Sequence, residues 1–283
     1  MGKLAPLSHQ ATKAVSSYLE GTRTRGNETI ERRIGDAARI GEWMQERYGL
    51  ENLSNLKSKH VEAFFRAKQG EGLSASTLAN YATTARIIAS AIGKENIVPR
   101  TNAELGFSRA GDRLNPIQAD VTRLGEIRGE LYQRGEWLGL AAEMREQFGL
   151  RNRESIMWSG NVVTRLDGTQ AIQLTRQDGT KGGRVREVPI RTEAQRELVD
   201  RVRGYMQGNR GQLYPTSMTS KQAYNYQRDV LHRLGATKTA AANAHAARHA
   251  YAQERISQGA DRQQVAEELG HGREDVVSHY VSR

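Results

Sequence analysis

The sequence predicts a mainly α-helical protein of two domains, with a small antiparallel β-sheet confined to the second. Three observations lead to this fold class. Apolar residues recur at helical spacing through most of the 283 residues, only the stretch 159–190 alternates as strands do, and the chain is long enough for two hydrophobic cores. We place the domains at 1–98 and 115–283, joined by a linker at 99–114 that is interrupted by proline and glycine.

The first domain is predicted to contain four helices. Ser8 is expected to cap the first, which ends near Leu19, and Gly93 follows the last in the position where glycine commonly ends a helix. The other segments carry apolar residues on one face, as amphipathic helices do. The expected ranges are 8–19, 28–48, 59–68 and 74–92.

The second domain is predicted to begin with a long helix. Asn115 and Pro116 have the order of an N-cap and a first helical residue, and the helical pattern then continues to about Phe148, with a break near Gly135. Four further helices are expected after the strands, at 192–207, 219–234, 243–258 and 261–269.

A three-stranded meander is predicted between these helices. Asp167 and Gly168 separate two β-rich runs, which is a strong hairpin signal. A longer turn at 178–183 then precedes a strand at 184–190. The expected sheet is therefore antiparallel and small.

The composition favours a polyanionic partner. The formal charge is +10, and the excess of basic residues divides equally between 1–110 and 111–283. We therefore expect both domains to bind such a partner. The chain has no cysteine, which removes disulfides and thiolate chemistry and points to the cytoplasm. No segment approaches the ~18 apolar residues of a membrane span, so we expect nucleic acid rather than a membrane.

Four of the seven histidines lie near the end of the sequence, namely His245, His249, His271 and His279. Taken singly, each is more often a core or surface histidine than a functional one. His245 and His249 have the i, i+4 spacing of a metal chelate, but Ala246 stands where the H-E-x-x-H pattern requires glutamate. We therefore expect no metal and no cofactor.

Two basic residues elsewhere are also candidates. Arg151 follows a helix end, and Glu154, three residues on, is placed to hold its guanidinium. Lys181 lies in the second predicted turn, but Gly182 follows it and a strand comes next, unlike a phosphate-binding P-loop. Alone, each is better explained as an ordinary surface residue.

Taken together, six residues resemble the catalytic set of the tyrosine recombinase (phage integrase) family. The motifs are "GLRNRE", "TKGGRVREVPI", "HAARH", and "LGH" followed nine residues later by tyrosine. They cover about 145–283, and residues 1–98 resemble more generally the family's helical, SAM-like core-binding domain. The matching residues are Arg151, Lys181, His245, Arg248, His271 and Tyr280.

The resemblance implies a reaction on DNA. Tyr280 would attack a phosphodiester and leave a 3′-phosphotyrosyl link, while Arg151 and Arg248 hold the phosphate oxygens. Lys181 would protonate the leaving 5′-hydroxyl, and His245 and His271 would serve in proton transfer and phosphate contact. No ATP or metal is needed, and His249 and His279 are expected to be structural neighbours.

The resemblance also implies partners. Family members act on double-stranded DNA as four protomers on two sites, through a Holliday junction, to integrate or excise a mobile element, in some cases with DNA-bending or directionality proteins. We expect a cytoplasmic protein that associates with the nucleoid when it acts. A type IB topoisomerase or telomere resolvase shares this chemistry, whereas a non-cutting accessory protein or a metallo-hydrolase fits the six residues less well.

The chain departs from the family pattern at three places. Arg153 stands where an apolar or small residue is usual, and Ala247 stands where leucine is usual. Only three residues follow Tyr280, whereas many relatives continue with a segment that packs on the next subunit. We expect this contact between subunits to be absent, made by another element, or lost by truncation of the sequence.

Overall fold

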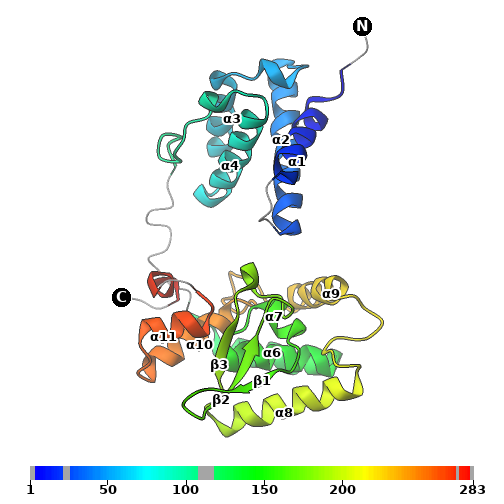
Figure 1. Cartoon of the computed structure of the whole chain (residues 1–283), viewed down its shortest axis with the longest axis vertical. Coiled ribbons are helices and arrows are strands. Elements are labelled where there is room, and N and C mark those ends of the chain that lie inside the picture. Colours follow the sequence, from blue (N-terminus) through cyan, green and yellow to red (C-terminus); the bar gives the residue numbers. More distant parts are fainter. Residues whose placement is uncertain (1–3, 22–25, 108–117, 272–273, 281–283) are drawn as a thin grey trace. The chain divides into compact units, whose positions relative to one another are not determined.

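The computed structural model describes residues 4–21, 26–107, 118–271 and 274–280. The chain divides into two compact units, Met1–Asp112 and Arg113–Arg283, and the only sheet in the described part belongs to the second (Figure 1). The mainly helical fold class is confirmed. No helix in the described part is both long and apolar enough to cross a bilayer.

The first unit is a helical bundle. Helices α1, α2 and α4 pack on one another, and α3 packs on α2 and α4. The four predicted helices are present, and their apolar faces form one buried core. The elements are α1 (Leu7–Glu20), α2 (Asn27–Tyr48), η1 (Leu53–Asn55), α3 (Ser58–Gly70), α4 (Ala75–Ala91) and η2 (Glu95–Ile97), where η marks a 3₁₀ helix.

The start of α1 differs from the prediction. Ser8 lies inside the helix, and Pro6 occupies the N-cap position without a side-chain hydrogen bond. The backbone N–H of Leu7 donates instead to Oε1 of Gln45 on α2, at 2.9 Å. A tertiary contact thus satisfies a donor that sequence patterns assign to a local cap.

The chain after α4 stays packed on the first unit. Val98 and Phe107 are buried in its core. Arg86 of α4 donates from Nε to the carbonyl of Pro99 at 2.8 Å, and from Nη1 to Oδ1 of Asn102 at 3.1 Å. Part of the predicted linker therefore belongs to this unit. Residues 108–114 lie outside the described ranges, and the domain limits stay a prediction.

The second unit contains the sheet, seven α-helices and two 3₁₀ helices in its described residues. Its elements are α5 (Val121–Arg134), α6 (Glu136–Phe148), α7 (Asn152–Met157), β1 (Val162–Thr164), β2 (Gln170–Leu174), η3 (Lys181–Gly183), β3 (Arg186–Pro189), α8 (Glu193–Gly208), α9 (Ser220–Arg233), α10 (Ala246–Ser257), α11 (Arg262–Glu268) and η4 (Glu274–His279). One core joins them, with α6 packed on α5, α7, α8 and α10.

The expected break at Gly135 separates α5 from α6. The predicted start at Asn115 and Pro116 lies outside the described residues. Helix α5 begins at Val121, where Oδ1 of Asp120 accepts the backbone N–H of Arg123 at 2.9 Å. Asp120 is therefore the N-cap of α5.

The three-stranded meander is confirmed. The strand order is β1-β2-β3, both pairs are antiparallel, and Ile172 pairs with Val162 on one side and Val188 on the other. Asp167 closes the first turn by accepting the backbone N–H and hydroxyl of Thr169. The second turn carries Lys181 between β2 and β3.

Replacing Asp120 with alanine should remove the cap of α5. We expect the free energy of unfolding to fall by about 1 kcal/mol, measured by urea denaturation, because the N–H of Arg123 loses its acceptor. Asp120→Asn keeps an acceptor in the same place and should stay close to the wild type. Equal losses in both variants would contradict the capping role.

Candidate active site

Arg151 is placed by a sharp turn between two helices. Helix α6 ends at Phe148, Gly149 adopts a left-handed φ of 60°, and Arg151 is the N-cap residue of α7. A Cβ on Gly149 would lie 2.5 Å from Cδ1 of Tyr251 on α10. Glycine is thus required both for the backbone angle and for the close approach of α10.

A buried carboxylate holds Arg151. Glu154 is fully buried, and its carboxylate accepts the backbone N–H and Nη1–H of Arg151, each at 2.7 Å. Arg186 of β3 binds the same carboxylate bidentately, at 2.9 and 2.7 Å. Burial raises the pKa of Glu154, but the hydrogen bonds and charge of Arg186, with the charge of Arg151, outweigh it and lower the pKa to about 2. Glu154 is therefore ionised and fixes the Arg151 guanidinium.

Arg248 is buried in the second unit with 0% exposure. Its Nη1–H donates to the carbonyl of Gly149 at 2.6 Å, its Nη2–H donates to the carbonyl of Leu269, and Nη2 lies 3.2 Å from Nε2 of His271. Burial, and secondarily the charge of Arg151, lowers the pKa of Arg248 to about 10. The guanidinium therefore stays charged at neutral pH and links the ends of α6 and α11.

Tyr280 lies directly against these groups. Its hydroxyl oxygen is 3.1 Å from Nε2 of His271 and accepts the Nε–H of Arg248 at 3.4 Å. The residue is only 5% exposed, and its ring lies 4.6 Å from the ring of His249. Its carbonyl accepts Nε2–H of Gln253 at 2.9 Å. Tyr280 is thus a buried phenol held by α10 and by the segment after α11.

Two histidines at the site are uncharged at neutral pH. Burial, then the charges of Arg248 and Arg151, lowers the pKa of His271 to about 3. Loss of water contact, then the charges of His249, Arg248 and Arg151, lowers the pKa of His245 to about 4. Because a guanidinium can only donate, its bond to Nε2 of His271 makes that nitrogen an acceptor. The Tyr280 hydroxyl is then the donor in its hydrogen bond to the same nitrogen.

Lys181 is not part of this contact network. It is exposed on η3 and makes no hydrogen bond or ion pair with the other described residues. Five of the six predicted residues are thus linked by direct contacts or by charge, and Lys181 stands apart. The side chain of His279 lies outside what the structure describes.

Sequence reasoning missed Arg186. Residue 186 lies two positions before the buried Val188 on β3, so the alternation of the strand points its side chain to the core. A charged residue on the buried face of a strand signals an ion pair, and Glu154 is that partner. Two of the three departures from the family pattern are accommodated by packing: Ala247 is buried in the core, and Arg153 packs on Gly179.

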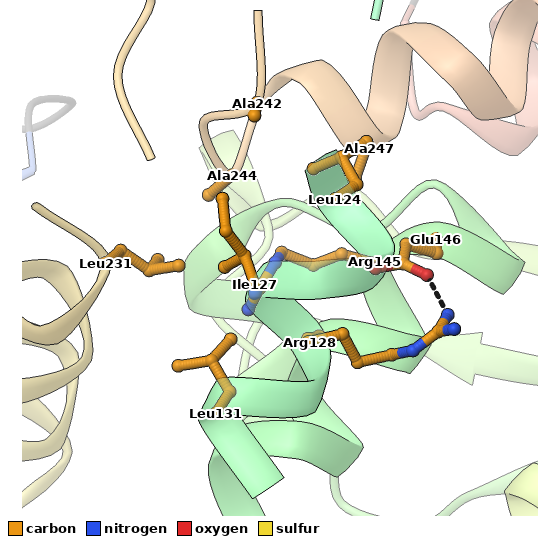
Figure 2. A pocket seen from close by; sticks show the side chains of 11 residues that line it. Leu124, Ile127, Arg128, Leu131, Arg145, Glu146, Leu231, Ala242, Ala244 and Ala247 are labelled. Atoms are coloured by element: carbon orange, nitrogen blue, oxygen red, sulfur yellow. Dashed lines mark hydrogen bonds and ion pairs between the residues drawn. The ribbon is translucent and has the colours of Figure 1, made fainter. Parts of the chain in front are cut away.

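A small pocket lies between α5, α6, α9 and the start of α10 (Figure 2). It is lined by Arg145, whose Nη1 donates to Oδ1 of Asn152 at 3.1 Å and to Oγ of Ser155 at 3.4 Å. Arg128 and Glu146 form an ion pair at its edge. None of the six predicted residues lines this pocket.

Across the described residues, no group of three or more histidine, aspartate or glutamate side chains is arranged to hold a metal ion. The groups that converge are instead two guanidiniums, two neutral imidazoles and a phenol. This set can bind an anion through the arginines and place a nucleophilic oxygen beside it.

Two family models match the sequence. The family described as "Integrase" matches residues 121–254, and the family described as "Phage integrase, N-terminal" matches residues 23–98. Between them the matches span most of both units. No curated protein sequence matches the chain.

Solved structures with DNA share the fold. The XerH site-specific recombinase bound to difH substrate has a TM-score of 0.63 at 14% identity, covering 100% of this chain and 95% of that chain. A lambda integrase tetramer bound to a Holliday junction has a TM-score of 0.63 at 16% identity, and the match covers 98% of this chain and 80% of that chain. The Tn1549 transposon integrase in complex with transposon right end DNA has a TM-score of 0.60 at 15% identity, and the match covers 96% of this chain and 95% of that chain. At these identities the likeness establishes the fold.

The depressed pKa of His271 should make the protein acid-sensitive. An unfolded histidine titrates near 6.5, so below that pH the unfolded chain binds more protons than the folded protein. The stability from this site is present above pH 6.5 and is lost as pH falls towards 3. We expect the free energy of unfolding to fall by about 1 kcal/mol per pH unit between pH 6 and 4 for this histidine. Urea denaturation of His271→Gln should give a shallower slope, and an unchanged slope would contradict the assignment.

Proposed function

Since the chain belongs to the phage integrase (tyrosine recombinase) family, we propose that it cuts and rejoins DNA strands to integrate or excise a mobile element. The observation that carries this proposal is the position of the Tyr280 hydroxyl, 3.1 Å from Nε2 of His271 and 3.4 Å from Nε of Arg248. A phenol with a proton acceptor on one side and a guanidinium on the other is suited to become a nucleophile.

The two catalytic arginines would bind the scissile phosphate. Attack on a phosphodiester places negative charge on the nonbridging oxygens, and guanidiniums stabilise that charge best when they are fixed in advance. Glu154 fixes Arg151, and the carbonyls of Gly149 and Leu269 fix Arg248. Both cations are thus held in place before substrate arrives.

The proton of Tyr280 would pass to His271. The hydroxyl oxygen then bonds to phosphorus as the bond to the 5′-oxygen breaks, leaving a 3′-phosphotyrosyl link. An arriving phosphodiester offsets part of the positive charge that holds the pKa of His271 down, which makes the imidazole a better proton acceptor. His245 would contact the phosphate from the start of α10.

Lys181 would donate a proton to the leaving 5′-oxygen. An exposed lysine followed by two glycines can reach a substrate that lies over the site, and Gly182 and Gly183 both have left-handed φ angles. The free 5′-hydroxyl of another strand then attacks the phosphotyrosine, and Tyr280 leaves. The phosphotyrosyl link conserves the energy of the broken phosphodiester bond, so the proposed reaction needs neither ATP nor a metal.

Strand exchange requires several copies of the chain. We assign a homotetramer on two double-stranded DNA sites, supported by the shared fold with a lambda integrase tetramer on a Holliday junction. The basic excess in both halves of the sequence is consistent with phosphate contacts from both units. The protein would act on DNA in the cytoplasm, where DNA-bending or directionality proteins could assist it.

Tyr280→Phe should bind DNA as the wild type does but form no covalent adduct, because only the hydroxyl is removed. Adducts that survive denaturation can be counted on gels with a nicked duplex that traps cleavage, and binding can be measured by mobility shift. Tyr226→Phe on α9 is the matched control and should form adducts normally. An adduct in Tyr280→Phe would contradict the assignment.

Lys181→Ala should cleave an ordinary strand roughly 100-fold more slowly, because the 5′-oxygen leaves without a proton. With sulfur in place of the bridging 5′-oxygen, the leaving group needs no proton and the rate should return close to that of the wild type. Single-turnover cleavage on both substrates measures this difference. Equal defects on the two substrates would rule out the general-acid role.

A further inference from the structure

The turn that carries Lys181 contains a buried carboxylate that the proposed chemistry does not use. Asp178 has 0% exposure, three residues before the exposed Lys181. Aspartate is seldom fully buried, and burying its charge is costly unless every lone pair finds a donor. The side chain therefore has a strong structural reason to be there.

Asp178 ties the turn to the end of α7. Its Oδ1 accepts the backbone N–H of Ser159 at 2.7 Å, and its Oδ2 accepts the backbone N–H and hydroxyl of Thr175 at 2.6 and 2.8 Å. Ser159 directly follows the C-cap residue of α7, and Thr175 directly follows β2. One carboxylate thus joins the helix that begins after Arg151 to the strand that leads to Lys181.

The next two residues extend this anchor. Gly179 has a φ of 76°, and a Cβ there would lie 2.9 Å from Cγ of Arg153 and 3.2 Å from Sδ of Met157, both on α7. Thr180 is 8% exposed and donates its hydroxyl to the carbonyl of Thr175 at 2.9 Å. The backbone is therefore held against α7 up to Thr180.

The turn becomes exposed to solvent at Lys181. Residues 181 and 182 are exposed, and Gly182 and Gly183 have φ angles of 73° and 70°. Lys181 is thus the first exposed residue after a backbone that is held at Thr180, and the position of Thr180 relative to α7 depends on the hydrogen bonds of Asp178.

We propose that Asp178 is a positioning residue for Lys181, fixing the turn on α7 so that the lysine reaches the leaving 5′-oxygen of the phosphate held by Arg151. This inference rests on the proposed function, because it needs Lys181 to be the general acid. It accounts for a fully buried aspartate and a left-handed glycine packed on Arg153, where the sequence departs from its family.

The test uses Asp178→Asn and a matched control in the other hairpin. Asp167 accepts the backbone N–H and hydroxyl of Thr169 in the same manner as Asp178 does with Thr175, but its turn carries no lysine. Asp178→Asn should slow single-turnover cleavage of the oxygen substrate by about tenfold or more, and the 5′-bridging sulfur substrate should restore the rate to within about twofold. Asp167→Asn should cleave both substrates as the wild type does.

A second variant covers the case in which Asp178→Asn does not fold, as judged by circular dichroism and DNA binding. Thr180→Val removes only the hydrogen bond to the carbonyl of Thr175. It should slow cleavage of the oxygen substrate less than Asp178→Asn does, and the sulfur substrate should again restore the rate. A defect that is equal on both substrates in a folded variant overturns the positioning role.

The outcomes separate this inference from the proposed function. If the sulfur substrate restores the cleavage rate of Lys181→Ala but not that of Asp178→Asn, Lys181 is still the general acid and the positioning role of Asp178 is wrong. If the sulfur substrate restores the cleavage rate of neither variant, the general-acid role of Lys181 is wrong, and the positioning role of Asp178 is wrong with it. If the wild type forms no adduct on any duplex, the proposed function itself is wrong.

Discussion

The second unit is organised around the buried guanidinium of Arg248. A charged group with 0% exposure must replace its lost water with hydrogen bonds, and the partners of Arg248 among the described residues include no carboxylate. The acceptors are the carbonyls of Gly149 and Leu269, the imidazole of His271 and the hydroxyl of Tyr280. Because leaving such a donor unpaired is costly, the ends of α6 and α11 and the last described segment are held together by one side chain.

The two arginines are held by different means, and the difference sets the charge of the site. Arg151 shares the carboxylate of Glu154 with Arg186, whereas Arg248 relies on neutral acceptors. One carboxylate for three guanidiniums leaves the site positively charged, and this charge adds to the larger effect of burial in lowering the pKa values of His245 and His271. A site that holds excess positive charge in a buried setting gains most when a phosphate arrives.

Local patterns predicted most of the fold, and tertiary contacts explain the failures. The Asp167–Gly168 turn and the helix-ending Gly93 are local signals, and both lie where the pattern places them. Ser8 was a plausible cap, but Gln45 from another helix satisfies the start of α1. The resemblance of the motifs to a family's catalytic set grouped Tyr280 with Arg248 and His271, and in the structure these three side chains contact one another. Arg186 and Asp178 carry no such motif, because their roles depend on partners that only the folded chain brings within reach.

The central claim is that Tyr280 becomes covalently linked to DNA. The most direct measurement is mass spectrometry of the adduct trapped on a nicked duplex, after protease and nuclease digestion, which identifies the linked residue and the linked end of the strand together. The account predicts a 3′-phosphate joined to the hydroxyl of Tyr280 and a free 5′-hydroxyl on the other product. A link to another residue, or a link through a 5′-phosphate, would contradict it.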